Sequence, residues 1–282
     1  MKRLVMTVAA MSAALVAAGA VEWKNVDEEH YLGGRKASAG YLQGKVVLVD
    51  RWGAKCPPCR ALLPTVEKKI WQSFKTKSFV VLGGHCGGWG SAEAVKGLIE
   101  ENSITYPVYE DAGLANGEPA YDAIPFLYLV DETGKVVYKG RDENTCIQAV
   151  VTALTDMDAP KNLADWKRFL DFELENLPGK AYLRMGEFKK KFPKEAKDYA
   201  EKFKALAAVP DVKKLSELVA FAKRAKDAPV FSPKKKQQQA KYQKSVKDAL
   251  TKFASLKESK DPRVVQEAKN ALADLKWTAA TF

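Results

Sequence analysis

The sequence predicts an α/β domain with a mixed sheet flanked by helices, followed by an all-α domain of helical hairpins. Runs rich in Gly, Val and aromatic residues dominate the first half of the chain, and Ala, Lys and Leu dominate the second. The charge divides at the same place: residues 1–150 carry no net charge, so the formal charge of +11 lies in residues 151–282. A chain of 282 residues also exceeds a typical single domain of about 100 to 200 residues.

Residues 1–20 have the layout of a secretory signal peptide. Lys2 and Arg3 precede an apolar stretch that ends near Val16, and small residues lead to a cleavage site expected after Ala20. This stretch is shorter than the roughly 20 residues of a membrane-spanning helix, which favours cleavage over a retained anchor. No later segment has a spanning pattern. We therefore expect an exported chain in the periplasm or extracytoplasmic envelope, where disulfides form.

The first domain, residues 21–157, shows five short β-branched and aromatic runs that predict strands. Two segments between them have helical spacing, the second opened by Ser91 as an N-cap. Gly134 favours a hairpin between the last two strands. The sheet should be parallel where helices intervene and antiparallel at the hairpin. The predicted strands are 45–50, 79–84, 106–109, 126–131 and 135–140, and the predicted helices are 59–74, 91–102 and 145–154.

Residues 158–282 are predicted to be helical throughout, after a boundary that Pro160 marks. Short periodic stretches separated by prolines predict stacked antiparallel hairpins, and no repeat consensus is visible. The lysines, including those of residues 233–241, would suit an acidic protein, an envelope polyanion or anionic lipid, although lysine-rich helix faces are commonly only solvated. Nucleic acid is not expected as a partner outside the cytoplasm. A client-docking or dimerising module is our interpretation of this domain.

The stretch WGAKCPPCR places Cys56 and Cys59, with Pro57 and Pro58 between them, after the first strong strand and at the start of a helix. Helix N-termini offer unsatisfied N–H groups and the positive end of the dipole, and both favour a thiolate. In such Cys-X-X-Cys settings the thiol pKa falls from about 8.5 to roughly 3.5 to 7.5. We expect Cys56 to be the exposed, attacking thiol and Cys59, one turn inward, to be the resolving thiol.

Other uses of the pair are a metal site, haem attachment or a structural disulfide. Covalent haem attachment needs His directly after Cys59, and Arg60 occupies that position. A structural disulfide stays open as an alternative. Structural zinc commonly needs four ligands, and the remaining candidates stand at scattered spacing: His30, His85, Cys86 and Cys146. The sequence therefore requires neither a metal nor an organic cofactor.

Residues 44–59 and 123–140, with the order of strands and helices between them, resemble the thioredoxin-like proteins, and among these the exported thiol-disulfide oxidoreductases of the TlpA/ResA type. The resemblance covers about residues 25–155. It implies a thioredoxin-like fold and thiol-disulfide exchange, in the direction of a reductant. The implied partners are disulfide-containing or dithiol client proteins and an upstream thiol-disulfide electron donor or acceptor.

The resemblance also implies two site residues by position. Asp50 would be a buried carboxylate that accepts the proton of the resolving thiol, because burial raises a carboxylate pKa toward the range of a general base. Pro125 would be a cis-proline packed against the dithiol. The alternatives are a strand-end cap for Asp50 and an ordinary trans proline at a strand start for Pro125.

Substrate contacts follow from the same resemblance. The Ile124 backbone would pair with an extended client segment beside Cys56, and Trp52 joins it as a substrate-binding residue. Two positions depart from the family: Lys55 stands where Trp is usual, and Arg51 stands where an apolar aromatic residue is usual. Cations beside Cys56 would stabilise its thiolate and make the pair more oxidising, or they are simply solvated. With Pro57 and Pro58, they are treated as modulating residues.

The stretch GGHCGGWG brings His85 and Cys86 to the same edge of the predicted sheet as the dithiol. We interpret His85 as a loop hydrogen-bonder. A Cys86–Cys146 disulfide is one possibility, although two strands at about 4.8 Å each should separate the supporting strands, beyond bridging distance unless the glycine loop folds across. A redox-active free thiol and inert buried thiols are the alternatives.

Two classes of function compete. In the first, Cys56 attacks a partner disulfide and Cys59 resolves the mixed disulfide, with Asp50 taking the proton. In the second, the chain is a binding or scaffold protein whose helical domain carries the function and whose disulfide is structural. A peroxide-reducing role would require rapid oxidation of Cys56 or Cys86 by peroxide.

Overall fold

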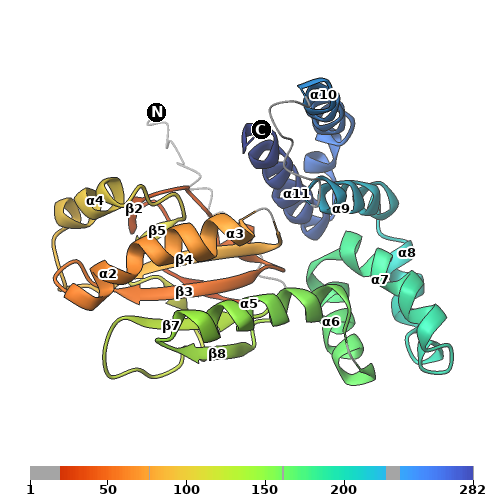
Figure 1. The fold of residues 1–282 in the computed structure, drawn as a ribbon. Coiled ribbons are helices and arrows are strands. Elements are labelled where there is room, and N and C mark those ends of the chain that lie inside the picture. Colours follow the sequence, from red (N-terminus) through yellow and green to blue (C-terminus); the bar gives the residue numbers. More distant parts are fainter. Residues whose placement is uncertain (1–19, 76, 161, 227–235, 282) are drawn as a thin grey trace, which may run out of the picture.

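The computed structural model describes residues 20–75, 77–160, 162–226 and 236–281, which form an α/β part followed by a helical part (Figure 1). The predicted signal peptide, except Ala20, lies outside these residues, as does part of the lysine-rich segment 233–241. The predicted fold class is confirmed: a mixed sheet flanked by helices is followed by a region of mostly helices.

The sheet of the α/β part has six strands in the order β2-β5-β4-β3-β7-β8. β3 runs parallel to β4 and antiparallel to β7, and β7 and β8 form the closing hairpin, as predicted. A separate pair of very short strands, β1 and β6, is also present. The strands are β1 Trp23–Lys24, β2 Tyr31–Gly33, β3 Val46–Trp52, β4 Phe79–His85, β5 Val108–Glu110, β6 Gly113–Leu114, β7 Phe126–Val130 and β8 Val136–Gly140.

The central strand β3 is buried along its whole length and separates two hydrophobic clusters. Leu48 and Trp52 belong to the cluster that also contains residues of α2, α4 and α5. Val47 and Val49 belong to the cluster on the other face. Because side chains alternate along a strand, Asp50 faces the first cluster and Arg51 faces the second. This alternation decides the surroundings of both residues.

The segment predicted as one helix over residues 59–74 is three consecutive helical pieces. The first piece is α2 (Pro57–Thr65), the second is a π-helical turn over Val66–Trp71, and the third is α3 (Gln72–Phe74). Pro64 lies within α2, and a proline has no backbone N–H to give to the preceding turn. The wider turn begins two residues after it.

The remaining helices of the α/β part begin at side-chain caps. The Ser91 hydroxyl accepts a hydrogen bond from the Ala94 backbone N–H at 3.3 Å at the start of α4 (Ala92–Glu101), as predicted. Asp142 caps α5 (Glu143–Asp158), which extends beyond the predicted 145–154 at both ends. Gly134 has a φ of 89° in the hairpin, where a left-handed conformation favours glycine. One short helix, α1 (Ala39–Leu42), was not predicted.

The helical part packs around aromatic and aliphatic clusters of its own. Trp166, Phe188 and Tyr199 lie in one cluster, and a second joins α9, α10 and α11. Within the described residues, no helix combines the length and apolar character that a membrane crossing needs. The helices are α6 Leu163–Asn176, α7 Pro178–Lys191, α8 Ala200–Ala207, α9 Val212–Lys226, α10 Lys236–Lys252 and α11 Pro262–Thr281, with short 3₁₀ turns at Glu195–Lys197 and Ala254–Glu258.

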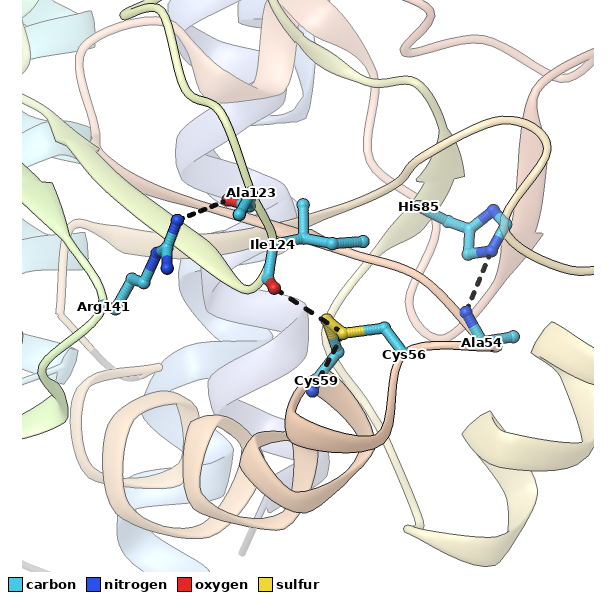
Figure 2. The surroundings of a disulfide bond; sticks show 7 residues. All are labelled: Ala54, Cys56, Cys59, His85, Ala123, Ile124 and Arg141. Carbon is cyan, nitrogen blue, oxygen red and sulfur yellow. Dashed lines mark hydrogen bonds between the residues drawn. A yellow bond between two sulfur atoms is a disulfide. The ribbon is translucent and has the colours of Figure 1, made fainter.

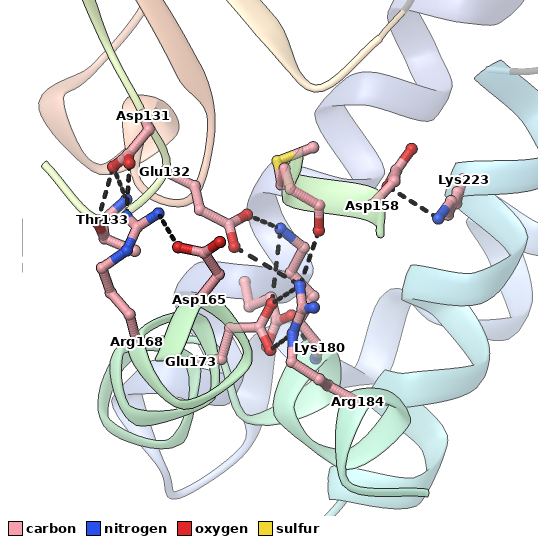
Figure 3. A network of polar contacts seen from close by, with 12 residues as sticks. Asp131, Glu132, Thr133, Asp158, Asp165, Arg168, Glu173, Lys180, Arg184 and Lys223 are labelled. Atoms are coloured by element: carbon pink, nitrogen blue, oxygen red, sulfur yellow. Dashed lines mark hydrogen bonds and ion pairs between the residues drawn. The ribbon is translucent and has the colours of Figure 1, made fainter. Parts of the chain in front are cut away.

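Buried charges join the two parts (Figure 3). Arg184 of α7 donates two hydrogen bonds to the Glu173 carboxylate of α6, at 2.6 and 2.8 Å, and one to the Met157 carbonyl at 3.0 Å. It also lies 3.6 Å from Glu132, which follows β7, and Lys180 forms an ion pair with Glu132. Glu132 and Glu173 are fully buried. Burial raises the pKa of Glu132 to about 7, and the two cations oppose this rise.

A second contact lies beside the start of β3. Asp274 of α11 accepts a hydrogen bond from Lys45 at 2.8 Å and another from the Tyr41 hydroxyl at 2.6 Å. Asn270 donates to the Gly40 carbonyl at 2.8 Å. The helical part therefore packs against the end of the sheet where β3 begins, whereas the dithiol follows the other end of β3 (Figure 1).

Candidate active site

Cys56 and Cys59 form a disulfide at the first turn of α2. Cys56 is the N-cap residue, and its sulfur accepts a hydrogen bond from the Cys59 backbone N–H at 3.2 Å (Figure 2). The helix start therefore directs a donor and the positive end of its dipole at this sulfur. In the reduced protein the same groups would stabilise a Cys56 thiolate.

The loop before β7 lies against the disulfide. The Ile124–Pro125 peptide bond is cis, and the Ile124 carbonyl oxygen lies 3.7 Å from Cys56 Sγ (Figure 2). Arg141 donates hydrogen bonds to the Ala123 carbonyl at 3.2 Å and to the Asp122 carboxylate at 3.1 Å. The structure thus brings the predicted residues Ile124 and Pro125 to the dithiol.

The expected exposure of Cys56 is wrong. Its exposed fraction is 3%, against 1% for Cys59. The loop that contains Ile124 lies against Cys56. A second loop is held beside the site, because the backbone N–H of Lys55 donates to the Trp89 carbonyl at 2.8 Å. Pro57 and Pro58 are exposed instead. The sulfur of Cys56 is therefore little accessible to a client, and the two loops lie beside it.

Asp50 lies on the face of the sheet that carries the dithiol, with an exposed fraction of 1%. Neither of its carboxylate oxygens has a hydrogen-bond partner among the described residues. Burial raises the pKa of Asp50 to about 7, and the nearby Tyr106 hydroxyl and the charge of Arg51 oppose part of the rise. A carboxyl group with this pKa can take up or release a proton near neutral pH.

We expect the ionisation of Asp50 to lower the stability of the oxidised protein as pH rises. Because its folded pKa lies above the unfolded value of about 3.9, the stabilisation from the protonated form is complete below pH 4 and is lost as pH rises toward 7. Between pH 5 and 7 the unfolding free energy of the wild type should fall by about 2 kcal/mol relative to Asp50→Asn.

Urea unfolding at several pH values measures this difference, with both cysteines kept in the disulfide. Other buried carboxyl groups cancel in the comparison because both proteins contain them. Asp248→Asn removes an exposed carboxylate and should give no such pH-dependent difference. A flat difference for Asp50→Asn would show that Asp50 does not titrate in this range.

Arg51 does not lie beside Cys56, which corrects the expectation that its charge acts on the thiolate. The strand turns its side chain to the opposite face, where it is 4% exposed. There it donates to the Tyr121 hydroxyl at 2.9 Å and to the Ala112 carbonyl at 2.9 Å, and it contacts Asp111 at 3.3 Å. Of the two predicted cations, only Lys55, which is exposed, adjoins the dithiol in the chain.

His85 supports the loop that leads into the dithiol. Its Nε2 accepts a hydrogen bond from the Ala54 backbone N–H at 3.3 Å (Figure 2), and its ring packs edge-on against Trp52 with centroids 5.2 Å apart. Burial lowers the pKa of His85, which favours the neutral ring that this hydrogen bond requires. His85 therefore acts as the predicted loop hydrogen-bonder. Trp52 is fully buried in the core, so its expected role in binding substrate is wrong.

The other two cysteines are free and buried, so the structure contradicts a Cys86–Cys146 disulfide. Two strands, β3 and β7, separate β4 from β8, and Cys146 belongs to the cluster on the dithiol face whereas Cys86 lies beside Tyr121. Cys86 contacts the Tyr121 hydroxyl at 3.9 Å, and burial raises its pKa. Burial raises the pKa of Cys146 to about 12. Both thiols are therefore protonated near neutral pH, the less reactive form.

Two residues at the site were not singled out from the sequence. Tyr106 is fully buried and lies beside Asp50, and its ring contacts Gly83, the register partner of Asp50 on β4. Trp89 is 46% exposed beside the dithiol loop. A tryptophan between two glycines after a strand was an available signal for an exposed loop residue, whereas the position of Tyr106 depends on tertiary packing.

No group of three or more His, Cys, Asp or Glu residues suited to a metal occurs among the described residues.

The six-stranded mixed sheet, the disulfide at the N-terminus of α2 and the facing cis-proline loop define a protein with a thioredoxin-like domain. No family model matches the chain. The chain is 29% identical over 105 residues to the thioredoxin-like protein YneN of Bacillus subtilis, and 29% identical over 115 residues to the thiol-disulfide oxidoreductase ResA of Bacillus cereus. The predicted resemblance to this type of protein is confirmed.

These similarities cover part of each chain. They span 37% and 40% of this chain, and 61% and 65% of YneN and ResA. Among solved structures, a thiol:disulfide interchange protein from Chlorobium tepidum matches with 21% identity and a TM-score of 0.38, covering 44% of this chain and 90% of its own. A putative thioredoxin from Neisseria meningitidis matches with 28% identity and a TM-score of 0.39, covering 46% and 87%.

Proposed function

We propose that this protein is an exported thiol-disulfide oxidoreductase that exchanges its Cys56–Cys59 pair with client proteins. The observation that carries the proposal is the disulfide at a helix N-terminus, with Cys56 as the N-cap residue and the Ile124 carbonyl 3.7 Å from its sulfur. The similarity to ResA supports the same chemistry. Export rests on the layout of residues 1–20, since that segment reads as a secretory signal peptide.

In the reaction we propose, the reduced protein transfers two electrons to a client disulfide. The Cys56 thiolate attacks one client sulfur, forms a mixed disulfide and releases the other client sulfur as a thiolate. Cys59 gives its proton to Asp50, and its thiolate then attacks Cys56 Sγ. This step releases the second client sulfur as a thiolate, which takes a proton from water, and closes the Cys56–Cys59 disulfide. An upstream dithiol protein must then reduce the pair again.

The surroundings of the pair favour the role of a reductant. Arg51 is held on the opposite face of the sheet by Tyr121, Ala112 and Asp111, so it does not stabilise a Cys56 thiolate. The buried carboxylate of Asp50 disfavours a second negative charge on its side of the sheet. A stabilised reduced form makes a dithiol an oxidant. The helix start supports the Cys56 thiolate, but Arg51 adds nothing to this support and Asp50 opposes it, and this balance favours an electron donor.

The reduction potential of the Cys56/Cys59 pair tests this proposal. Equilibration of the mature protein in glutathione or dithiothreitol buffers, with mass mapping of all four cysteines, should give a value between about −230 and −270 mV. A value near about −120 mV would indicate an oxidant instead, and one below about −300 mV would indicate a structural disulfide. The last result would favour the binding or scaffold alternative, in which the helical domain carries the function.

The helical domain, residues 158–282, is proposed as a docking module for an acidic protein or an envelope polyanion. Its net positive charge supports this, since residues 151–282 carry the whole formal excess of +11. The module packs at the start of β3, and the dithiol follows the other end of that strand (Figure 1). It would therefore bind a partner at a place separate from the exchange site.

A further inference from the structure

The backbone of an exposed tryptophan is held beside the dithiol loop. Trp89 is 46% exposed, yet its backbone is held at both ends: its carbonyl accepts from the Lys55 N–H at 2.8 Å, and its N–H donates to the Cys86 carbonyl at 3.2 Å. The next residue, Gly90, has a φ of 143°, and a Cβ there would lie 2.6 Å from the Ala54 side chain. Glycine thus allows the loop to approach the dithiol loop closely.

The indole belongs to the rim of the exchange site. A Cβ at Gly53 would lie 2.5 Å from Trp89 Cβ and 3.0 Å from Ile124 Cδ1. The Trp89 and Ile124 side chains therefore border Gly53 from two sides, and Ile124 is the residue whose carbonyl lies 3.7 Å from Cys56 Sγ. The approach to Cys56 has an apolar border at this point.

The two residues next to the cysteine pair in the chain are cations. Lys55 and Arg60 flank the pair in the chain, both are exposed, and neither forms an ion pair with any residue that the structure describes. Other exposed cations of this domain do pair, such as Lys69 with Glu143 at 2.9 Å. The mature α/β part has a slight negative net charge, whereas both residues that flank the stretch from Cys56 to Cys59 are cations.

We propose that this rim selects client segments that carry an aromatic or large aliphatic side chain and a carboxylate close to the disulfide cysteine. The inference rests on the proposed exchange function and adds its substrate class. A tryptophan side chain has only two torsion angles to fix on binding, so it loses little conformational entropy, and aromatic side chains supply much of the energy of many contacts. Unpaired cations attract a client carboxylate and repel a client lysine.

The test uses four synthetic peptides, each a disulfide-linked homodimer with one cysteine per chain. The residues beside the cysteine are Phe or Ser on one side, and Glu or Lys on the other. Second-order rate constants for oxidation of the reduced full-length protein by each peptide are divided by the rate constant of dithiothreitol with the same peptide. This division removes differences in intrinsic disulfide reactivity.

The wild type should react about tenfold faster with Phe peptides than with Ser peptides, and severalfold faster with Glu than with Lys peptides. Trp89→Ala should abolish the Phe preference and keep the Glu preference. Lys55→Glu should abolish or invert the Glu preference and keep the Phe preference. Val137→Ala and Lys139→Glu change exposed residues of β8 and should keep both preferences.

The outcomes distinguish failure of the proposed selectivity from failure of the proposed exchange function. If all four peptides oxidise the reduced wild type at equal normalised rates, the proposed exchange function stands and the proposed selectivity is wrong. The same conclusion follows if Trp89→Ala keeps the full Phe preference. If the wild type reacts with none of the peptides, the exchange function fails, and the substrate class fails with it.

Discussion

Replacing Cys59 with serine should abolish turnover and trap Cys56 in a mixed disulfide with its client. The hydrogen bond that Cys56 Sγ accepts at 3.2 Å comes from the backbone N–H of residue 59, so the substitution leaves it in place. The helix N-terminus also stays, and Cys56 keeps the groups that favour its thiolate. Only the thiol that releases the client is missing, so close to one equivalent of mixed disulfide should accumulate.

Non-reducing gels and mass mapping of the trapped species measure this result, with the peptide homodimers described above as clients. Cys56→Ser is the matched control and should trap nothing, because the attacking sulfur is absent. Cys86→Ser should leave trapping through Cys56 unchanged in a Cys59→Ser background, since Cys86 contacts Tyr121 and Arg51 on the other face of the sheet. Continued turnover by Cys59→Ser would overturn the proposed mechanism.

Replacing Arg184 with methionine should lower the free energy of unfolding by about 3 to 5 kcal/mol. Arg184 is 8% exposed and binds Glu173 through two hydrogen bonds while also facing Glu132. Its removal leaves two fully buried carboxylates, and among the described residues Lys180 is then the cation that pairs with them. An uncompensated buried charge costs far more than the pair itself contributes.

Urea unfolding measures this cost, and the chain offers a matched control. Lys223 pairs with Asp158 at 2.9 Å on the surface, where both side chains are more than half exposed, so Lys223→Met should cost less than about 1 kcal/mol. The double variant Arg184→Met/Glu173→Leu should recover much of the loss, because the stranded charge is removed with its partner. A cost for Arg184→Met no larger than that of Lys223→Met would refute the expectation.

Much of the α/β part could be predicted because its strands are long, buried and apolar. The run over residues 45–50 appears as β3, which begins one residue later and ends two residues later, and 79–84 appears as β4, which ends one residue later. The strands β1, β2 and β6 have two or three residues each, too few for a periodic pattern to show. The π-helical turn after Pro64 likewise reflects local backbone geometry that helical periodicity does not register.

At the site, too, features set by local sequence could be predicted, and features set by tertiary packing could not. The position of Cys56 and Cys59 follows from the order of strand and helix, and the burial of Asp50 follows from its place on a central strand. Strand alternation could also have placed Arg51 opposite Asp50. The burial of Cys56 could not be foreseen, because it depends on two loops distant in sequence. Nor could the pairing of Lys45 with Asp274, which are separated by 229 residues.

The position of that last pair sets the distance between the helical part and the dithiol. Lys45 immediately precedes β3, and the dithiol loop follows the strand's last residue, Trp52. Seven residues of extended chain at about 3.3 Å each make a rigid spacer of roughly 20 Å. If the helical part were bound to a large partner, the dithiol would stay at the opposite end of this spacer. It could then still meet large client proteins.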